Sequence, residues 1–206
     1  RKYRGVNALG NAVELYEALE ELDQERREGR EYQPAVNQDP KAAGSVTNLS
    51  VSIMRAGDWA SKVPGEAVME ARVGWPPGET GEAVERQVEQ TIESVVADHE
   101  YMADNPPELE WFGWRAEAHE LDRDEPIVQT AKQTAESVTG REGTFVGGLG
   151  GLDERFYAKY YDIPAVTVGP TGHGGHSHDE YVDLDSLVET AKTYALTAMD
   201  WCGVEE

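Results

Sequence analysis

A glycine- and histidine-rich loop is the densest group of chemically versatile residues in the sequence. Residues 172–180 read Gly-His-Gly-Gly-His-Ser-His-Asp-Glu, so three imidazoles and two carboxylates lie close together. Neutral imidazole is a good ligand for zinc and similar ions, and glycine lets the backbone come close to a bound ligand. Histidine-rich loops are also often simply solvated, so the spacing alone leaves a metal site and a solvated loop as open alternatives.

A second group of residues combines a glycine pair with charged side chains. Gly150 and Gly151 lead into Leu152-Asp153-Glu154-Arg155-Phe156, where a helix is expected to begin. A glycine-led helix start favours anions, and the guanidinium of Arg155 can form paired hydrogen bonds with a carboxylate. The structural alternative is that Asp153 caps the helix and Arg155 makes a surface ion pair.

The charge balance limits the partners of this 206-residue chain. Lys and Arg number 18 against 40 Asp and Glu, which gives a net charge of −22. Such a chain repels phosphates, which argues against nucleic acid and an anionic membrane surface as partners. The acidity is dispersed and lysine is scarce, a composition that suits a salt-rich cytoplasm in which screening removes self-repulsion. We therefore expect a halophilic protein, the alternative being an ordinary acidic mesophilic enzyme.

The remaining composition favours a folded cytoplasmic protein. No apolar run approaches the roughly 18 residues of a transmembrane helix, and the first residues, RKYRGVNALG, lack the apolar core of a signal peptide. The single cysteine, Cys202, excludes an internal disulfide.

Residues 1–116 predict an α+β unit. Apolar spacing indicates helices over about 7–27 and from Thr80 onward, and alternation predicts strands near 49–53, 68–75 and 109–114, with a polar loop over 28–43. The resulting order, α-β-β-α-β, lacks only a leading strand to be a split βαβ, ferredoxin-like unit with two helices on an antiparallel sheet.

Residues 117–206 predict an α/β part. Helices are expected over 126–139 and 153–160 and from a cap at Asp185, with strands at 144–146 and 163–168. The second strand is almost wholly apolar, as in a strand buried on both faces. The loop 172–180 follows it, at the sheet edge where ligands of open α/β sheets bind.

Together, the glycine-pair motif at 150–156 and the histidine-rich loop at 172–180 resemble the zinc-dependent deacylase and carboxypeptidase family. This family includes acetylornithine deacetylase, succinyl-diaminopimelate desuccinylase and glutamate carboxypeptidase. The stretch GGLDERFYAKYYDIPAVTVGPTGHGGHSHDEYVDLDSL is similar to the family's Gly-Gly-Thr-Asp-x-Arg, Ile-Pro-x-Val and His-x-x-Asp-Glu-Tyr sequence. The front half, from RGVNAL to KVPGEAVMEARVGWPPGE, resembles the family's lid or dimerisation domain. The resemblance implies a lid over 1–116 that forms a homodimer, and over 117–206 the C-terminal part of a zinc-peptidase-like catalytic domain.

The resemblance also implies roles for two residues. His176 would bind one of two zinc ions, with cobalt as an alternative metal, because Asp179 and Glu180 follow at the family's offsets. Arg155 would recognise the carboxylate of a small N-acyl amino acid or dipeptide substrate. His173 and His178 lie outside the motif. The sequence departs from the family at Leu152, where Thr or Ser is usual, and near Ser61, where the lid often has Asn.

The family's other metal-binding motifs, a His-x-Asp sequence and a Glu-Glu catalytic pair, are missing from this sequence. Glu20-Glu21 lies within the first predicted helix and cannot replace that pair. We therefore expect the C-terminal piece of an enzyme about twice as long, with no catalytic residue of its own and zinc absent or weakly bound.

The expected function is that of part of a metal-dependent amidohydrolase that removes an N-acyl group from an amino acid, as in amino-acid biosynthesis. The alternatives are a dipeptidase or carboxypeptidase of the same family, a non-catalytic dimerisation module, and a histidine-loop metal-binding module unrelated to catalysis.

Overall fold

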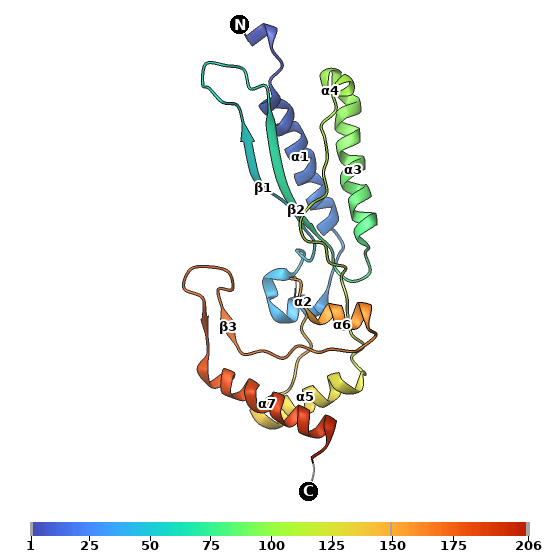
Figure 1. Cartoon of the computed structure of the whole chain (residues 1–206), viewed down its shortest axis with the longest axis vertical. Coiled ribbons are helices and arrows are strands. Elements are labelled where there is room, and N and C mark those ends of the chain that lie inside the picture. Colours follow the sequence, from blue (N-terminus) through green and yellow to red (C-terminus); the bar gives the residue numbers. More distant parts are fainter. Residues whose placement is uncertain (1, 149, 205–206) are drawn as a thin grey trace. The chain divides into compact units, whose positions relative to one another are not determined.

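The computed structural model describes residues 2–148 and 150–204, which divide into two compact units, Arg1–Ala118 and His119–Glu206. Unit 1 contains the short 3-10 helices η1 (Lys2–Arg4) and η2 (Pro40–Ala42) besides its helices and strands (Figure 1). Each unit is described by itself below.

Two helices cover one face of a two-stranded sheet in unit 1. Strand β1 (Asn48–Ala56) pairs antiparallel with β2 (Ala67–Gly74), and α1 (Ala8–Arg27) and α3 (Gly81–Asp98) lie on the same side of this pair (Figure 1). The apolar stripes of both helices meet the inward residues of the strands. The resulting core comprises Leu19, Leu22, Leu49 and Val88, with Val51, Val73 and Ile92 packed against it.

A buried arginine joins the elements of unit 1 at one end. Arg26 of α1 is 2% exposed and donates from Nη1 to Gln87 Oε1 of α3 at 2.5 Å and from Nη2 to the Gly74 carbonyl of β2 at 3.2 Å. Its Nη2 also lies 2.8 Å from Glu79 Oε2, and Arg30 pairs with the other oxygen of that carboxylate at 2.7 Å. A buried charge needs such partners, so this network holds α1, α3 and the end of β2 together.

Several predicted elements of unit 1 are confirmed. The first helix has the expected bounds within one residue, and the Thr80 side chain accepts a hydrogen bond from the Ala83 N–H, as an N-cap does. The segment 28–43, predicted as a loop, instead contains α2 (Gln33–Gln38), with Pro34 in its first turn. A short helix, α4 (Glu100–Asp104), follows α3.

The third predicted strand of unit 1, residues 109–114, does not form. The segment is held to α3 by side chains, with Trp111 Nε1 donating to Glu89 Oε1 at 3.1 Å and Arg115 Nη1 lying 3.1 Å from Glu85 Oε1. A strand needs a neighbour for its backbone groups, and among the described residues β1 and β2 pair only with each other. The ferredoxin-like arrangement therefore stays a prediction.

Unit 2 is built on two packed helices, α5 (Pro126–Thr139) and α7 (Leu184–Cys202), with a shorter α6 (Glu154–Tyr160). Helix α5 has the predicted bounds and ends at Gly140, which adopts the left-handed conformation usual after a helix. The contact between α5 and α7 is polar at its centre, where the hydroxyls of Thr134 and Thr197 lie 2.9 Å apart.

The predicted strands 144–146 and 163–168 of unit 2 are wrong for the same reason as the third strand of unit 1. The sheets of the described residues are β1–β2 and a small hairpin of β3 (Gly172–His173) and β4 (Tyr181–Val182), so neither segment has a strand beside it. The Val168 carbonyl instead accepts a hydrogen bond from the Tyr194 hydroxyl at 2.6 Å. Unit 2 therefore combines helices with a small antiparallel hairpin, and its two predicted strands are not formed within the described residues.

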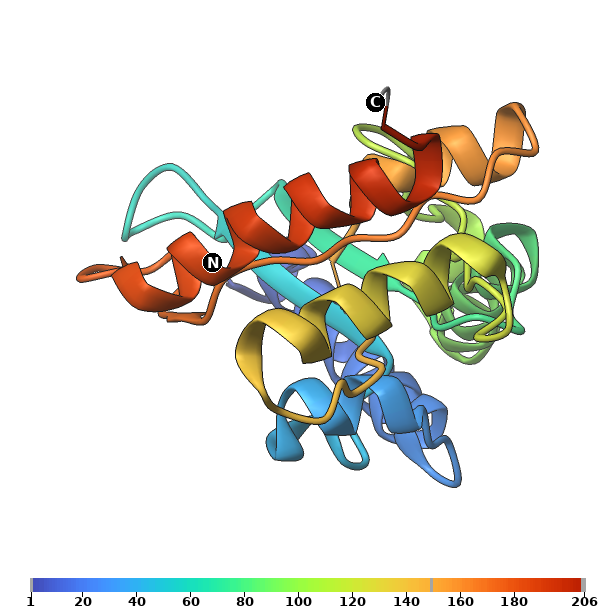
Figure 2. The same cartoon turned by 90° about the horizontal axis from the view of Figure 1, so that it is seen from below.

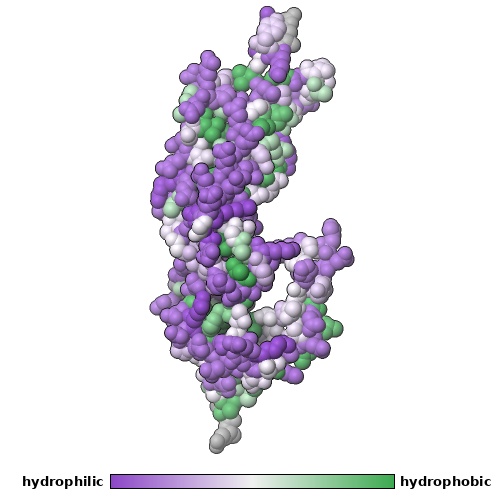
Figure 3. Space-filling view, turned by 180° about the vertical axis from the view of Figure 1, so that it is seen from behind, coloured by the Kyte–Doolittle hydropathy of each residue, from purple (hydrophilic) through white to green (hydrophobic). Residues whose placement is uncertain are grey.

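Hydrophilic residues cover most of the face seen in Figure 3, as the composition predicts, and smaller hydrophobic patches are scattered among them. Cys202 is free and exposed. In the part of the chain that the structure describes, no helix is both long and apolar enough to cross a membrane.

Candidate functional site

The loop that carries His176 is a tight excursion between β3 and β4. Gly174, His176 and Asp179 have positive φ angles of 75°, 64° and 60°. The His176 N–H donates to Glu180 Oε2 at 3.3 Å, and the Ser177 N–H donates to the Gly174 carbonyl at 2.8 Å. These local bonds fold the loop back on itself, and the His176 residue is exposed at its tip.

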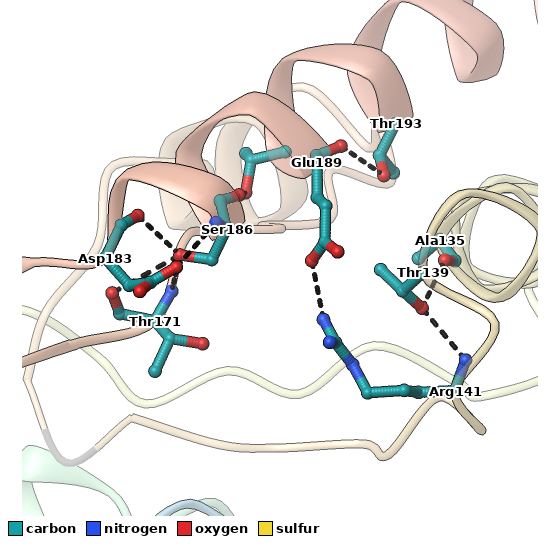
Figure 4. A network of polar contacts seen from close by, with 9 residues as sticks. Ala135, Thr139, Arg141, Thr171, Asp183, Ser186, Glu189 and Thr193 are labelled. Atoms are coloured by element: carbon teal, nitrogen blue, oxygen red, sulfur yellow. Dashed lines mark hydrogen bonds and ion pairs between the residues drawn. The ribbon is translucent and has the colours of Figure 1, made fainter.

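The base of this hairpin is fastened to the start of α7 (Figure 4). The Asp183 carboxylate accepts from the Ser186 N–H at 2.7 Å, and the Thr171 N–H donates to Ser186 Oγ at 2.9 Å. The Asp183 N–H donates in turn to the Thr171 carbonyl at 2.9 Å. The N-cap of α7 is therefore Asp183, and the predicted cap at Asp185 is wrong, because Asp185 already lies in the first turn.

A second contact fastens α7 to the loop that follows α5. Arg141 Nη2 lies 2.6 Å from Glu189 Oε2, and the Arg141 N–H donates to the Thr139 hydroxyl at 3.2 Å (Figure 4). Arg141 is exposed, so this pair orders the loop more than it stabilises the unit.

Arg155 is buried at the start of α6. Its Nη1 donates to the Leu152 carbonyl at 2.6 Å and lies 3.4 Å from Asp153 Oδ1, and its guanidinium carbon lies 4.1 Å from the centre of the Phe156 ring. The side chain of Asp153 makes no capping hydrogen bond to α6. The alternative prediction, that Asp153 caps the helix and Arg155 makes a surface ion pair, is therefore correct only in part. Arg155 does pair with Asp153, but Arg155 is buried and Asp153 does not cap the helix.

The two predicted site residues come from different ends of unit 2. Figures 1 and 2 both show the β3–β4 hairpin at the N-terminal end of α7 and α6 toward its other end. Arg155 contacts Leu152, Asp153 and Phe156 at the start of α6. The fold of this unit alone therefore does not assemble His176 and Arg155 into one site.

The other histidines of the loop have local surroundings. The His173 ring centre lies 6.1 Å from that of Tyr181 across the hairpin, and the His178 carbonyl accepts from Ser177 Oγ at 3.3 Å. In unit 1, Ser61 is exposed in the connection between β1 and β2, where Lys62 pairs with Asp58 at 2.7 Å. The side-chain hydrogen bond from the Lys62 ammonium is the main cause that holds the pKa of the Asp58 carboxyl below its usual value. The positive charge of Lys62 and the backbone N–H groups of Asp58 and Trp59 lower this pKa further.

Two histidines that the sequence analysis did not single out have carboxylate neighbours. His119 Nε2 lies 3.9 Å from Glu154 Oε1, beside Arg155, and His99 Nε2 lies 3.8 Å from Glu14 Oε2 in unit 1. His119 and Glu154 are far apart in the sequence, so no spacing signal indicates this pair. His99 is the N-cap of α4, a short helix that the sequence analysis does not predict, so no sequence signal indicates its role.

Comparison with known proteins decides the family. Residues 12–200 match Peptidase family M20/M25/M40. The chain belongs to this family. It is 21% identical over 207 residues to the N-formyl-4-amino-5-aminomethyl-2-methylpyrimidine deformylase of Halalkalibacterium halodurans, a match that covers 96% of this chain and 47% of that protein.

A solved M20 family structure has a similar fold. The metallo-carboxypeptidase Sso-CP2 of Sulfolobus solfataricus matches with a TM-score of 0.59 at 15% identity, over 87% of this chain and 41% of that chain. The chain therefore spans less than half the length of either protein. At this identity the structural likeness shows the fold alone.

The M20 family generally uses zinc or other divalent metals. Within 2–148 and 150–204, no three His, Cys, Asp or Glu side chains come together as a ligand group. A zinc centre typically needs about three protein ligands. The described residues therefore do not fit a catalytic metal centre by themselves, and the role of His176 as a ligand stays a prediction.

Proposed function

We propose that this M20 chain is part of a metal-dependent amidohydrolase that removes the N-acyl group from a small amino acid, as acetylornithine deacetylase and succinyl-diaminopimelate desuccinylase do. The observation that carries the proposal is the family match over residues 12–200. The deformylase among the relatives adds support, since a formyl group on nitrogen is the smallest N-acyl group. In this proposal residues 1–116 act as lid, and 117–206 as the C-terminal part of the catalytic domain.

Arg155 is proposed to bind the substrate carboxylate. Its guanidinium is withdrawn from water and packed over Phe156, so its direction is restricted before a ligand arrives. A charge-assisted hydrogen bond is stronger where water is excluded.

The test of Arg155 compares three variants of the protein encoded by the complete reading frame that contains this chain. Arg155→Ala should lower kcat/KM for an N-acyl amino acid about 10- to 100-fold, the equivalent of ~1.5–3 kcal/mol for a lost charge-assisted bond. Arg155→Lys keeps the charge but loses the planar fork and should recover only part of this. Arg123→Ala, which removes another arginine of unit 2, is the control; an equal loss there would refute a specific role.

His176 is proposed to supply one metal ligand, together with groups outside the described residues. The exposed tip of the hairpin leaves its imidazole accessible to a ligand set from elsewhere. His176→Ala should lower the zinc content of the reading-frame product, measured by atomic emission, whereas His178→Ala in the same loop should not. Equal zinc loss in both variants would assign the metal to the loop as a whole.

The 206-residue chain alone is proposed to be inactive on N-acetylornithine. The reason is ligand arithmetic, since the described residues bring no three ligands together and a catalytic zinc needs about that many. Zinc-dependent turnover by this chain alone would overturn both this proposal and the assignment of His176 as a single ligand.

A carboxypeptidase or dipeptidase is the second candidate function, favoured by the fold of the Sulfolobus metallo-carboxypeptidase. Both reactions cleave an amide next to a carboxylate, so Arg155 fits either. Parallel assays of N-acetylornithine, succinyl-diaminopimelate and a dipeptide distinguish them. A non-catalytic dimerisation module is the remaining alternative, supported if no amide substrate is turned over while the dimer forms.

The state of the protein in the cell is proposed to be a homodimer through the lid in a salt-rich cytoplasm. The net charge of −22 gives strong self-repulsion that salt screens. Light scattering should therefore show a dimer in molar salt, and the melting temperature should rise between low and molar salt. A strict monomer at high concentration contradicts the dimer, and an unchanged melting temperature contradicts the halophilic origin.

A further inference from the structure

His99 occupies the junction of two helices. It is the residue after α3 and the N-cap of α4, and its Nδ1 accepts hydrogen bonds from the Tyr101 N–H at 3.2 Å and the Met102 N–H at 3.1 Å. An imidazole nitrogen that accepts two N–H groups carries no proton. The cap therefore requires neutral His99 with its hydrogen on Nε2.

The other ring nitrogen of His99 faces carboxylates. Nε2 lies 3.8 Å from Glu14 Oε2 of α1, and a groove of about 320 Å³ beside it is lined by Glu14, Glu17, Ala18, Glu21, Val95, Asp98 and His99. Asp98 precedes His99 on α3, and Glu100 follows it on α4. The charged groups named on all three elements around the ring are acidic, so a protonated ring would have carboxylate partners there.

The backbone favours the two charge states at different ends of the junction. The last turn of α3 carries partial negative charge and attracts a cation, whereas the first turn of α4 presents N–H groups that repel one. A proton on Nδ1 would point a donor at the donors of Tyr101 and Met102, so both hydrogen bonds would be lost. The imidazolium would then be held by Glu14 and the end of α3.

We propose that His99 is a proton-operated latch: neutral, it caps and orders α4, and protonated, it releases α4 and pairs with the carboxylates of α1 and α3. The moving part is α4, whose Met102 is 3% exposed. Protonation of His99 opens the latch, independently of any hydrolytic activity.

The test measures amide hydrogen exchange of the 206-residue chain by NMR at pH 8 and pH 5, expressed as protection factors so that the intrinsic pH dependence is removed. The protection of Tyr101 and Met102 should fall about fivefold or more in acid, as expected for a lost N-cap. His99→Asn should keep its protection at both pH values, because an asparagine oxygen caps without titrating. His178→Asn removes an exposed histidine from unit 2 and should behave as the parent chain does.

Protection that does not change with pH in the parent chain overturns the latch, as does an equal loss in His99→Asn. Should that variant fail to fold by circular dichroism, the ¹⁵N shifts of the His99 ring decide in the parent chain. An unprotonated Nδ1 at pH 8 supports the latch, and a proton on Nδ1 at that pH refutes it.

Discussion

Helix α7 of unit 2 buries a different kind of side chain from the core of unit 1. Unit 1 places Leu19, Leu22, Leu49 and Val88, from two helices and a strand, in one apolar core. In unit 2 the buried positions of α7 are Ser186 and Thr193. The large apolar residues of the same helix are exposed, among them Leu184, Leu187, Val188, Met199 and Trp201.

This difference shows that the amphipathic pattern of a helix does not determine which element its apolar face packs against. In α1 the apolar stripe meets a sheet face, as predicted. In α7 the apolar stripe through Val188, Ala191, Ala195 and Ala198 faces away from α5, and the threonine face makes the contact. An exposed apolar surface of this kind is unusual unless something binds it. Unit 1 is therefore expected to account for more of the stability of this chain than unit 2.

The largest expected effect tests the core of unit 1. Leu19→Ala should lower the free energy of unfolding by about 2–5 kcal/mol, because it leaves a cavity beside Leu22 and Val88. The matched change in unit 2, Leu196→Ala on the outer side of α7, should cost less than about 1 kcal/mol. Urea denaturation followed by circular dichroism measures both. Similar costs would abolish the contrast between the units.

The buried ion pair of unit 1 comes next. Arg26→Met should cost about 2 kcal/mol, because Gln87 and the Gly74 carbonyl lose their partner while Arg30 still pairs with Glu79. Arg55→Met breaks an exposed pair with Glu70 on the same sheet and should cost at most about 1 kcal/mol. Thermal denaturation of the two variants side by side checks the ranking, which a larger loss for Arg55→Met would reverse.

The polar helix contact of unit 2 gives a smaller effect. Thr134→Val should cost about 1 kcal/mol, because the Thr197 hydroxyl loses its partner. The double variant Thr134→Val/Thr197→Val should recover most of that loss, since neither hydroxyl is then left unpaired. A double variant less stable than the single one would show that the hydroxyl pair specifies the contact.

The smallest effect concerns pH. The Lys132 ammonium at 2.6 Å and then the Gly143 N–H at 2.9 Å hold the pKa of the Glu136 carboxyl below its ordinary value of 4.5. Because the folded pKa is lowered, the stabilisation is complete above pH 4.5 and is lost as the pH falls through the lowered pKa. Glu136→Gln should remove this part of the acid dependence of unit 2. An unaltered acid-unfolding curve, recorded between pH 6 and pH 3, would count against it.

The site residues show the reach of sequence reasoning. The motifs singled out Arg155 and His176, but motif order says nothing of distance, and the structure places the two at different ends of unit 2 (Figures 1 and 2). The burial of Arg155 at the start of α6 was also not predicted, since one of the two interpretations of its motif was a surface ion pair. The capping role of His99 follows only from the structure, in which the ends of α3 and α4 meet at its ring.

The sequence by itself determined the longer helices and the charge of this protein, because helical spacing, caps such as Thr80 and terminators such as Gly140 act within a few residues. Only the tertiary structure decided which apolar segments became strands. The segments 49–53 and 68–75 overlap β1 and β2 (which ends at Gly74), and these strands pair with each other, whereas 109–114 and 163–168 have equal strand character but no partner among the described residues. A strand is stabilised by backbone groups of another segment, so its existence is a property of the pair and cannot be read from one segment alone.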